Sequence, residues 1–216
     1  MIGPLLLHVA VPADEAPGAL GRAIGARCVA HGRLAAILGP VRQESTTRAA
    51  LRHARIVAHA LDACTSVVPF RAGIEVASEQ EALELLAGNR EELSTRLRDL
   101  AGHVEMGLKV RIPGLGRPIE GSLASALVRI RALASRTVQP QERRKSLPGA
   151  TVLEACYLVP RSRIEPFWSE VAALRAETGL RVLGTGPWAP YSFCDLSLRA
   201  TSRAPSGAPP LERSLS

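Results

Sequence analysis

The sequence predicts an α+β protein, with a ferredoxin-like βαββαβ N-terminal domain, a second α+β domain and a disordered C-terminal tail. Short apolar runs bounded by Pro or Gly alternate with segments whose apolar residues recur every three or four positions. The 216 residues are 46% hydrophobic and 22% charged, which is typical of a globular protein. The last stretch, by contrast, is dominated by Ser, Pro, Gly and Ala and shows no periodicity.

The first domain is predicted over residues 1–75. Its opening run, Leu5–Val11, is almost wholly apolar and is closed by a proline, as in a buried strand. A weak helix follows over 17–27, where three glycines lower the helix propensity. Two apolar runs then flank His31-Gly32, a pattern that is typical of a β-hairpin.

A helix and a strand complete this domain. Candidate N-cap residues at 45–47 precede apolar residues that are spaced by four and three positions from Ala50 to Cys64, which makes one apolar stripe. Thr65–Phe70 returns to strand character, with Pro69 indicating a strand end or an edge strand. The order strand, helix, hairpin, helix, strand is that of a ferredoxin-like domain.

Residues 76–104 are predicted to form a helical connector. Ser78 and Glu81 have the spacing of a capping box at its start, and Gly88-Asn89 is expected to divide it into two helices.

The second domain is predicted over residues 105–196 and again alternates strands with helices. The polar segment 139–149 carries Arg143-Arg144-Lys145 and is expected to be an exposed loop. Residues 197–216 are expected to be the disordered tail. The regular elements are expected in this order: a strand at Glu105–Ile112, a helix from Leu123 to about Val138, a strand at Val152–Val159, a helix from the capping-box residues Ser162 and Glu165 to Gly179, and a strand at Leu180–Leu183.

The net charge of +7 and the pI of about 10.0 raise the question of nucleic-acid binding. The basic residues are interleaved with acidic ones along the predicted helices and are not gathered in one block. Solvated helix surfaces therefore explain the charge better than a nucleic-acid partner does.

The chain is predicted to be cytoplasmic and without a membrane span. The N-terminal apolar stretch has no basic region before it and is interrupted by Pro4 and His8, so it does not resemble a signal peptide. No run reaches the roughly 20 apolar residues that a spanning helix needs. The four cysteines are isolated from one another, as is usual in a reducing compartment.

A search for catalytic motifs yields no candidate. The sequence contains no HExxH, GxSxG or Walker motif and no cysteine pair with metal-ligand spacing, so no enzyme activity, metal or cofactor is predicted. Glu105 lies beside Met106-Gly107 at the start of a predicted strand, with no second acid placed near it. We expect its carboxylate to be paired with an Arg or a backbone N–H.

Six of the seven aromatic residues lie between Tyr157 and Phe193, which leaves two interpretations open. They form a compact core, or they form an interaction surface. The segment that ends at Phe193 contains two prolines, which restrict its backbone. It either locks the two domains together by burying Trp188 and Phe193, or presents Trp188 and Tyr191 to a partner. Locking is favoured, because large rings contribute most when buried.

Three segments resemble motifs of the gas vesicle protein GvpL/GvpF family, in the family's order, and the resemblance extends over residues 3–196. Two departures are that the opening strand reads Leu7-His8-Val9 in place of Y-x-Y-G, and that Phe70-Arg71-Ala72 stands where Leu-Arg-Phe is more typical. The matching segments are Val67–Gly73 with V-x-P-x-R-x-G, Glu105–Val110 with E-M/W-G-V-K-V, and Gly184–Phe193 with G-P-W-P-P-Y-S-F, while His53-Ala54 resembles the start of H-A-x-V.

The resemblance implies a non-enzymatic accessory protein of gas vesicle assembly, located in the cytoplasm and at the gas vesicle. Its implied partners are the hydrophobic shell protein and other gas vesicle accessory proteins. The alternative function is a ferredoxin-like regulatory or nucleic-acid-binding module, against which the first domain's lack of Trp and Tyr argues. Candidate residues for partner binding or domain locking, taken from the matching motifs, are Phe70, Arg71, Glu105, Lys109, Trp188, Tyr191 and Phe193.

Overall fold

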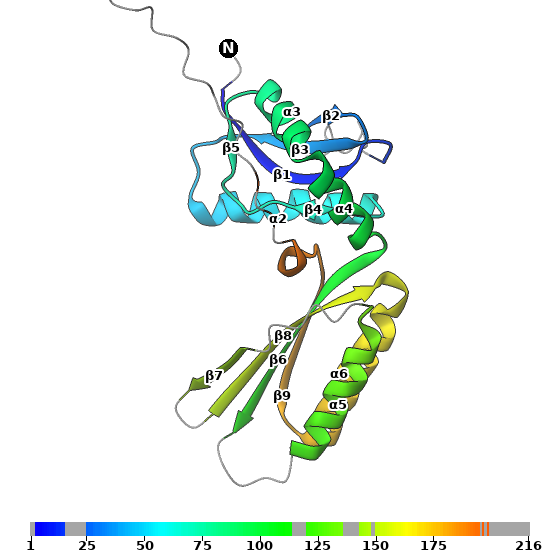
Figure 1. Cartoon of the computed structure of the whole chain (residues 1–216). Helices are drawn as coiled ribbons and strands as arrows, with labels where there is room; N and C mark the ends of the chain where they lie inside the picture. The colour runs from blue at the N-terminus through cyan, green and yellow to red at the C-terminus, as the bar shows by residue number, and fades with distance from the viewer. Residues whose placement is uncertain are drawn as a thin grey trace, which may run out of the picture.

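The protein has a sheet in each half, and the two sheets follow one another along the long axis of the molecule (Figure 1). The first sheet lies between helices, and the second has helices on one face. This arrangement confirms the α+β class. The structure is a computed structural model and describes residues 3–15, 25–113, 120–135, 143–147, 150–194, 196 and 198.

The first sheet is antiparallel, with the order β2-β3-β1-β4 and with β5 also paired to β1. The predicted hairpin is confirmed as β2 and β3. The predicted helix at 17–27 falls mainly on residues 16–24, which lie outside the described residues, so the full ferredoxin-like arrangement stays a prediction. The strands are β1 (Leu5–Pro12), β2 (Arg27–His31), β3 (Leu34–Pro40), β4 (Val68–Pro69) and β5 (Glu75–Val76).

Helices cover both faces of this sheet (Figure 1). On one face lies α2 (Thr46–Ala63), which begins after Ser45, whose hydroxyl accepts a hydrogen bond from a backbone N–H of the first turn. On the other face lie α3 (Glu79–Gly88) and α4 (Arg90–Leu100), formed by the segment that was predicted as a helical connector. Ser78 caps α3 as its spacing predicted.

The central strand β1 is buried on both faces. Val9 and Val11 belong to the core that contains α2, while Leu5 and Leu7 belong to the core that contains α3 and α4. The pairing of β1 with β3 shifts register between Leu7 and Val9, which marks a bulge at His8. The His8 side chain at this bulge reaches His53 of α2.

The second sheet is also antiparallel and has the order β7-β8-β6-β9. One face is covered by α5 (Glu120–Leu133) and α6 (Ile164–Thr178), which pack side by side (Figure 1). The strands are β6 (His103–Pro113), β7 (Arg143–Leu147), β8 (Ala150–Pro160) and β9 (Arg181–Trp188).

Two predictions for this half are wrong. The expected loop at 139–149 contains β7, because the backbone of an edge strand pairs with its neighbour whatever its side chains are, and charged side chains are common on edge strands. Ser162 does not cap α6. It lies in a 3₁₀ turn over Arg161–Arg163, and the helix begins after Arg163 without a side-chain cap.

The last strand is also longer than expected. The strand predicted at Leu180–Leu183 continues as β9 to Trp188, although two glycines and a proline follow Leu183. Pairing with β6 holds this stretch in the sheet, and β6 supplies that pairing from a distant part of the sequence. Most of the predicted tail, 197–216, lies outside the described residues.

Two hydrophobic cores cross the junction between the halves. The core under α2 is continuous with the core between the second sheet and its helices. The core under α3 and α4 includes Leu158 and Phe193 from the second half. The domain limits at 1–75, 76–104 and 105–196 stay predictions, since the packing does not separate the halves at either limit.

Candidate interaction site at the junction

Strand β9 runs toward the first half and is followed by the 3₁₀ turn Tyr191–Phe193, which lies between the two sheets (Figure 1). Ala189 and Pro190, which precede the turn, are buried. This segment belongs to the sequence signature that carried the family resemblance, and three of its side chains contact other elements.

Phe193 is the residue of the 3₁₀ turn that enters the hydrophobic core. Its side chain is 8% exposed and lies in the core beneath α3 and α4, together with Leu158 of β8 and Phe70, which follows β4. A buried ring of this size contributes a large share of the hydrophobic free energy of such a core. Phe193 therefore joins the C-terminal segment to the first sheet.

Tyr191 reaches the opposite face of the first sheet. Its hydroxyl lies 3.0 Å from His53 Nε2 on α2, and His53 Nδ1 lies 2.8 Å from Nδ1 of His8 in β1. Because the two Nδ1 atoms share one hydrogen bond, one must carry the proton and the other must offer its lone pair. The contact therefore excludes two charged imidazoles, and the two rings form a chain from β1 through α2 to the 3₁₀ turn.

Burial determines the protonation of this chain. It lowers the pKa of His8 from 6.5 to about 4, helped by the neighbouring His53 and by the positive charge of Arg52. Burial also lowers the pKa of His53. A side chain in place of Gly39 would put its Cβ 2.6 Å from His8 Nε2, so the imidazole fits only against a glycine.

Glu105 of β6 holds the 3₁₀ turn from the other side. One carboxylate oxygen accepts a hydrogen bond from the Ser192 backbone N–H at 2.7 Å, and the other accepts one from the Ser192 hydroxyl at 2.8 Å. The residue is 8% exposed, and charge-assisted hydrogen bonds are what a buried carboxylate requires. The predicted pairing of Glu105 with a backbone N–H is confirmed.

Arg161 makes a further contact across the junction. Its guanidinium donates to the backbone carbonyls of Leu61 and Cys64, at the C-terminal end of α2, where Cys64 O lies 3.1 Å away. The last turn of α2 contains no basic residue of its own, so this distant cation satisfies carbonyls that the helix leaves free and interacts with the negative end of its dipole. Nothing in the local sequence indicated this role.

Trp188 is the residue for which the locking interpretation is wrong. Its side chain is 55% exposed, because Trp188 ends an edge strand and the chain turns inward only at Ala189, which is 4% exposed. Trp188 pairs with Glu105 across the sheet and flanks the locked turn. The signature thus combines a buried anchor, Phe193, with an exposed ring.

The remaining candidate residues are spread over the molecule. Phe70 is fully buried in the core, whereas Arg71, next to it, is exposed. Lys109 lies further along β6 and forms an ion pair of 2.8 Å with Glu154 of β8. Tyr191, Phe193 and Glu105 meet at the junction, and Arg71 and Lys109 do not take part in the contacts described there.

The described residues offer little to metal or thiol chemistry. Among them no group of three or more His, Cys, Asp or Glu residues is placed to hold a metal ion. Cys64 and Cys194 are free thiols whose pKa burial raises, to about 11 and about 12 respectively, so neither is a thiolate at neutral pH. None of the described helices is both long and apolar enough to span a bilayer.

Fold and junction together define an α+β protein in which a C-terminal signature segment binds the two halves to each other. The sequence model of the family described as "Gas vesicle synthesis protein GvpL/GvpF" matches residues 11–120 and 118–195. The chain belongs to this family.

Individual relatives agree with this assignment. The chain is 30% identical to gas vesicle protein L of Streptomyces sp. (strain CB03234), in a match that covers 79% of this chain and 84% of the relative. It is 29% identical to gas vesicle protein F2 of Halobacterium salinarum, with 68% and 67% covered.

Solved structures show the same fold. The crystal structure of gas vesicle protein GvpF from Anabaena sp. PCC7120 superimposes with a TM-score of 0.72 at 15% identity, covering 90% of this chain and 97% of that one. GvpF from Microcystis aeruginosa gives a TM-score of 0.66 at 14% identity, covering 91% and 100%.

Proposed function

We propose that this member of a gas vesicle accessory family binds the hydrophobic shell protein, and other accessory proteins, while the vesicle is assembled in the cytoplasm. A shell subunit with an apolar surface aggregates in water unless a partner covers that surface. A protein in this role needs an apolar contact that stays exposed in its own folded state.

Trp188 is the observation that supports this proposal. A large aromatic ring that is 55% exposed gains free energy when a partner covers it. Glu105 and Phe193 hold the chain on both sides of the 3₁₀ turn that follows, so the ring is presented from a fixed backbone. A fixed backbone reduces the entropy lost on binding. The site would act by contact alone and would need no catalytic residue.

A capture experiment tests the proposal. Purified protein would be immobilised and exposed to shell protein refolded from denaturant, and the captured shell protein would be measured. We expect the Trp188→Ala variant to lose most of the captured material while its unfolding midpoint stays near that of the wild type. Val128→Ala, which removes an exposed apolar side chain from α5, serves as the matched control and is expected to bind normally. Failure of the wild-type protein to capture shell protein would contradict the proposal.

We also infer that the first half completes a ferredoxin-like βαββαβ arrangement. The strand order β2-β3-β1-β4 and the antiparallel pairing support it. The helix predicted at 17–27 is the missing element, and backbone amide exchange over that segment would test it: protected amides support a helix, and unprotected amides exclude it.

A further inference from the structure

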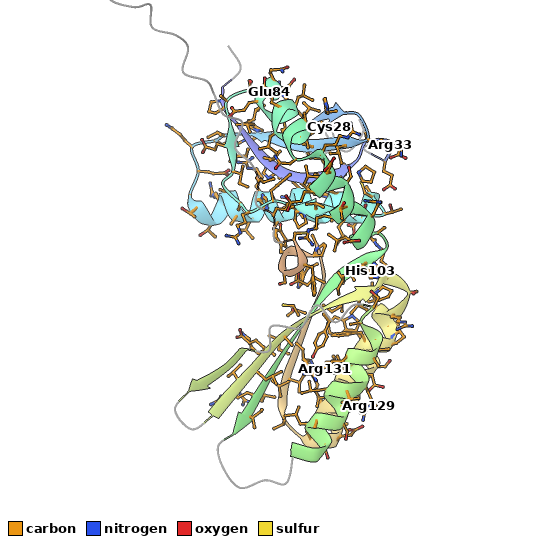
Figure 2. The ribbon with its side chains drawn as sticks, viewed as in Figure 1. Cys28, Arg33, Glu84, His103, Arg129 and Arg131 are labelled. Carbon is orange, nitrogen blue, oxygen red and sulfur yellow. The ribbon has the colours of Figure 1, made fainter. Side chains whose placement is uncertain are left out.

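The second sheet has a face that no described helix covers (Figure 1). The side chains of β6 alternate strictly. Leu108 and Val110 lie in the core under α5 and α6, whereas Lys109 and Arg111 are exposed on the opposite face. Arg129, labelled on α5 in Figure 2, lies on the covered side and is neutralised there by ion pairs with α6.

A groove of about 440 Å³ lies where this open face meets β9, the edge strand. Leu183 is 55% exposed in its wall, so the groove contains an aliphatic contact that no described residue covers. Its lining combines four aliphatic residues with four cations: Val152, Leu180, Val182 and Leu183, and Lys109, Arg111, Arg175 and Arg181.

The charge of the groove is not balanced within the described part of the protein. Lys109 pairs with Glu154, but Arg111 and Arg181 are exposed and form no ion pair with any described residue. These two arginines also occupy directly opposite positions on β6 and β9. Like charges opposite one another on neighbouring strands repel, so an anion bound between them would stabilise the sheet.

The two edge strands of the sheet differ in the charge of their sequences, which affects whether another strand can pair with them. The edge strand β7 has the basic sequence Arg-Arg-Lys from residue 143 to residue 145, and basic sequences are typical of edge strands that do not add another strand. The other edge strand, β9, has the uncharged sequence Val-Leu-Gly-Thr-Gly from Val182 to Gly186. Arg175 Nε binds the Val182 carbonyl at 3.0 Å and caps the start of this stretch. From Leu183 onward the edge carries no charged side chain that would repel a strand.

We propose that the outer edge of β9 accepts an extended segment of an acidic partner protein as an added strand. Side chains two positions apart in a strand share a face, as Arg181 and Leu183 do here. The segment would therefore place a carboxylate opposite Arg181 and an aliphatic side chain, two residues away, opposite Leu183. Backbone pairing supplies affinity in this mode and the alternate side chains supply specificity. The contacts proposed here are at Arg181 and Leu183, at the opposite end of β9 from Trp188, and the inference does not depend on shell-protein binding.

A labelled peptide tests the inference. The probe is Glu-Thr-Val-Thr-Glu-Thr-Val-Thr, and its binding to the full chain would be followed by fluorescence anisotropy. We expect a saturable signal that weakens as salt is added, and binding weaker by about tenfold or more when Lys replaces Glu or when the peptide backbone is N-methylated at alternate residues. Equal binding of the Glu and Lys peptides, or no binding of the Glu peptide at millimolar concentration, would overturn the inference.

Variants of the protein locate the binding site. Arg181→Glu is expected to weaken peptide binding by about tenfold or more. Arg55→Glu, which makes the same change at an exposed position of α2, is expected to leave binding unchanged. Equal loss in both variants would overturn the inference, as would displacement of the peptide by a single-stranded oligonucleotide that binds more tightly, since the cations would then serve a nucleic acid.

Discussion

The two sheets of this protein differ in the number of faces that helices cover. The first is covered on both faces, so β1 is apolar at successive positions and none of its residues from Leu5 to Val11 is exposed. The second is covered on one face, so β6 alternates between buried Leu108 and Val110 and exposed Lys109 and Arg111. A covered sheet can serve only as a scaffold, whereas an uncovered face remains available for contacts.

At the junction, one face of the second sheet changes from covered to open. The end of the second sheet next to the first half carries Leu158 and Glu105 on its otherwise open face, and the 3₁₀ turn Tyr191–Phe193 covers them there. Farther from the junction the same face holds the exposed Lys109 and Arg111. The C-terminal signature thus closes the open face where the halves meet and leaves the rest free.

The largest effect is expected at the anchor of the junction. Phe193→Ala removes a buried ring and leaves a cavity in the core under α3 and α4, which should lower the free energy of unfolding by about 3–5 kcal/mol. Trp188→Ala, in the same signature segment, should change it by less than about 1 kcal/mol because the ring is already largely in water. Urea denaturation of both variants measures the difference. Similar losses would mean that the two rings are not divided into anchor and exposed contact.

The alternation in β6 predicts that substitutions at adjacent residues of the strand change the free energy of unfolding by very different amounts. Leu108→Ala should lower the free energy of unfolding by about 2–5 kcal/mol, whereas Lys109→Ala should change it by about 0.5 kcal/mol or less. In β1 both Leu7→Ala and Val9→Ala should be strongly destabilising, since the two side chains enter different cores. Chemical denaturation of the four variants checks the comparison. A large loss for Lys109→Ala would show that the open face is covered after all.

The carboxylate at the junction should have an intermediate effect. Ser192→Ala removes one of the two hydrogen bonds of Glu105 and leaves part of a buried charge unsatisfied, which should cost about 1–3 kcal/mol of unfolding free energy. Ser169→Ala is the control, because that hydroxyl bonds only to the α6 carbonyl one turn before it among the described residues, and the site is exposed. Thermal unfolding of both variants distinguishes them. Equal stability would mean that Glu105 does not fasten the turn.

The histidine chain predicts a loss of stability that is absent at neutral pH and appears only in acid. The pKa of His8 is about 4 in the folded protein against 6.5 in the unfolded chain, so the unfolded chain binds more protons between these values. Stability should be unaffected by this group above pH 6.5 and should fall by up to about 1.4 kcal/mol per pH unit as the pH drops from 6.5 toward 4.

The pH dependence of denaturant midpoints measures this effect. His59→Asn, at an exposed position of α2, should reproduce the wild-type profile, whereas His8→Gln should show a shallower decline in acid. A profile that His8→Gln leaves unchanged would contradict the assignment.

Much of the secondary structure could be read from local pattern. The apolar run at Leu5–Val11, the stripe that became α2 and the Ser78 cap of α3 depend on residues that are neighbours in the chain, so their spacing is enough to predict them. The family motifs were also short and contiguous. The pairing of Glu105 with a backbone N–H could be expected, but not that Ser192 would supply it.

The errors and the omissions have one physical cause, which is that the stabilising partner is distant in sequence. β7 and the second half of β9 are strands because β8 and β6 pair with them, not because of their own residues. The same holds for His8 with His53 and for Arg161 with the end of α2, which lies about a hundred residues earlier in the chain. Periodicity shows which side of a strand or helix is apolar, whereas tertiary packing alone determines which rings are buried. Trp188 and Phe193 look alike in the sequence, yet one faces water and the other closes a core.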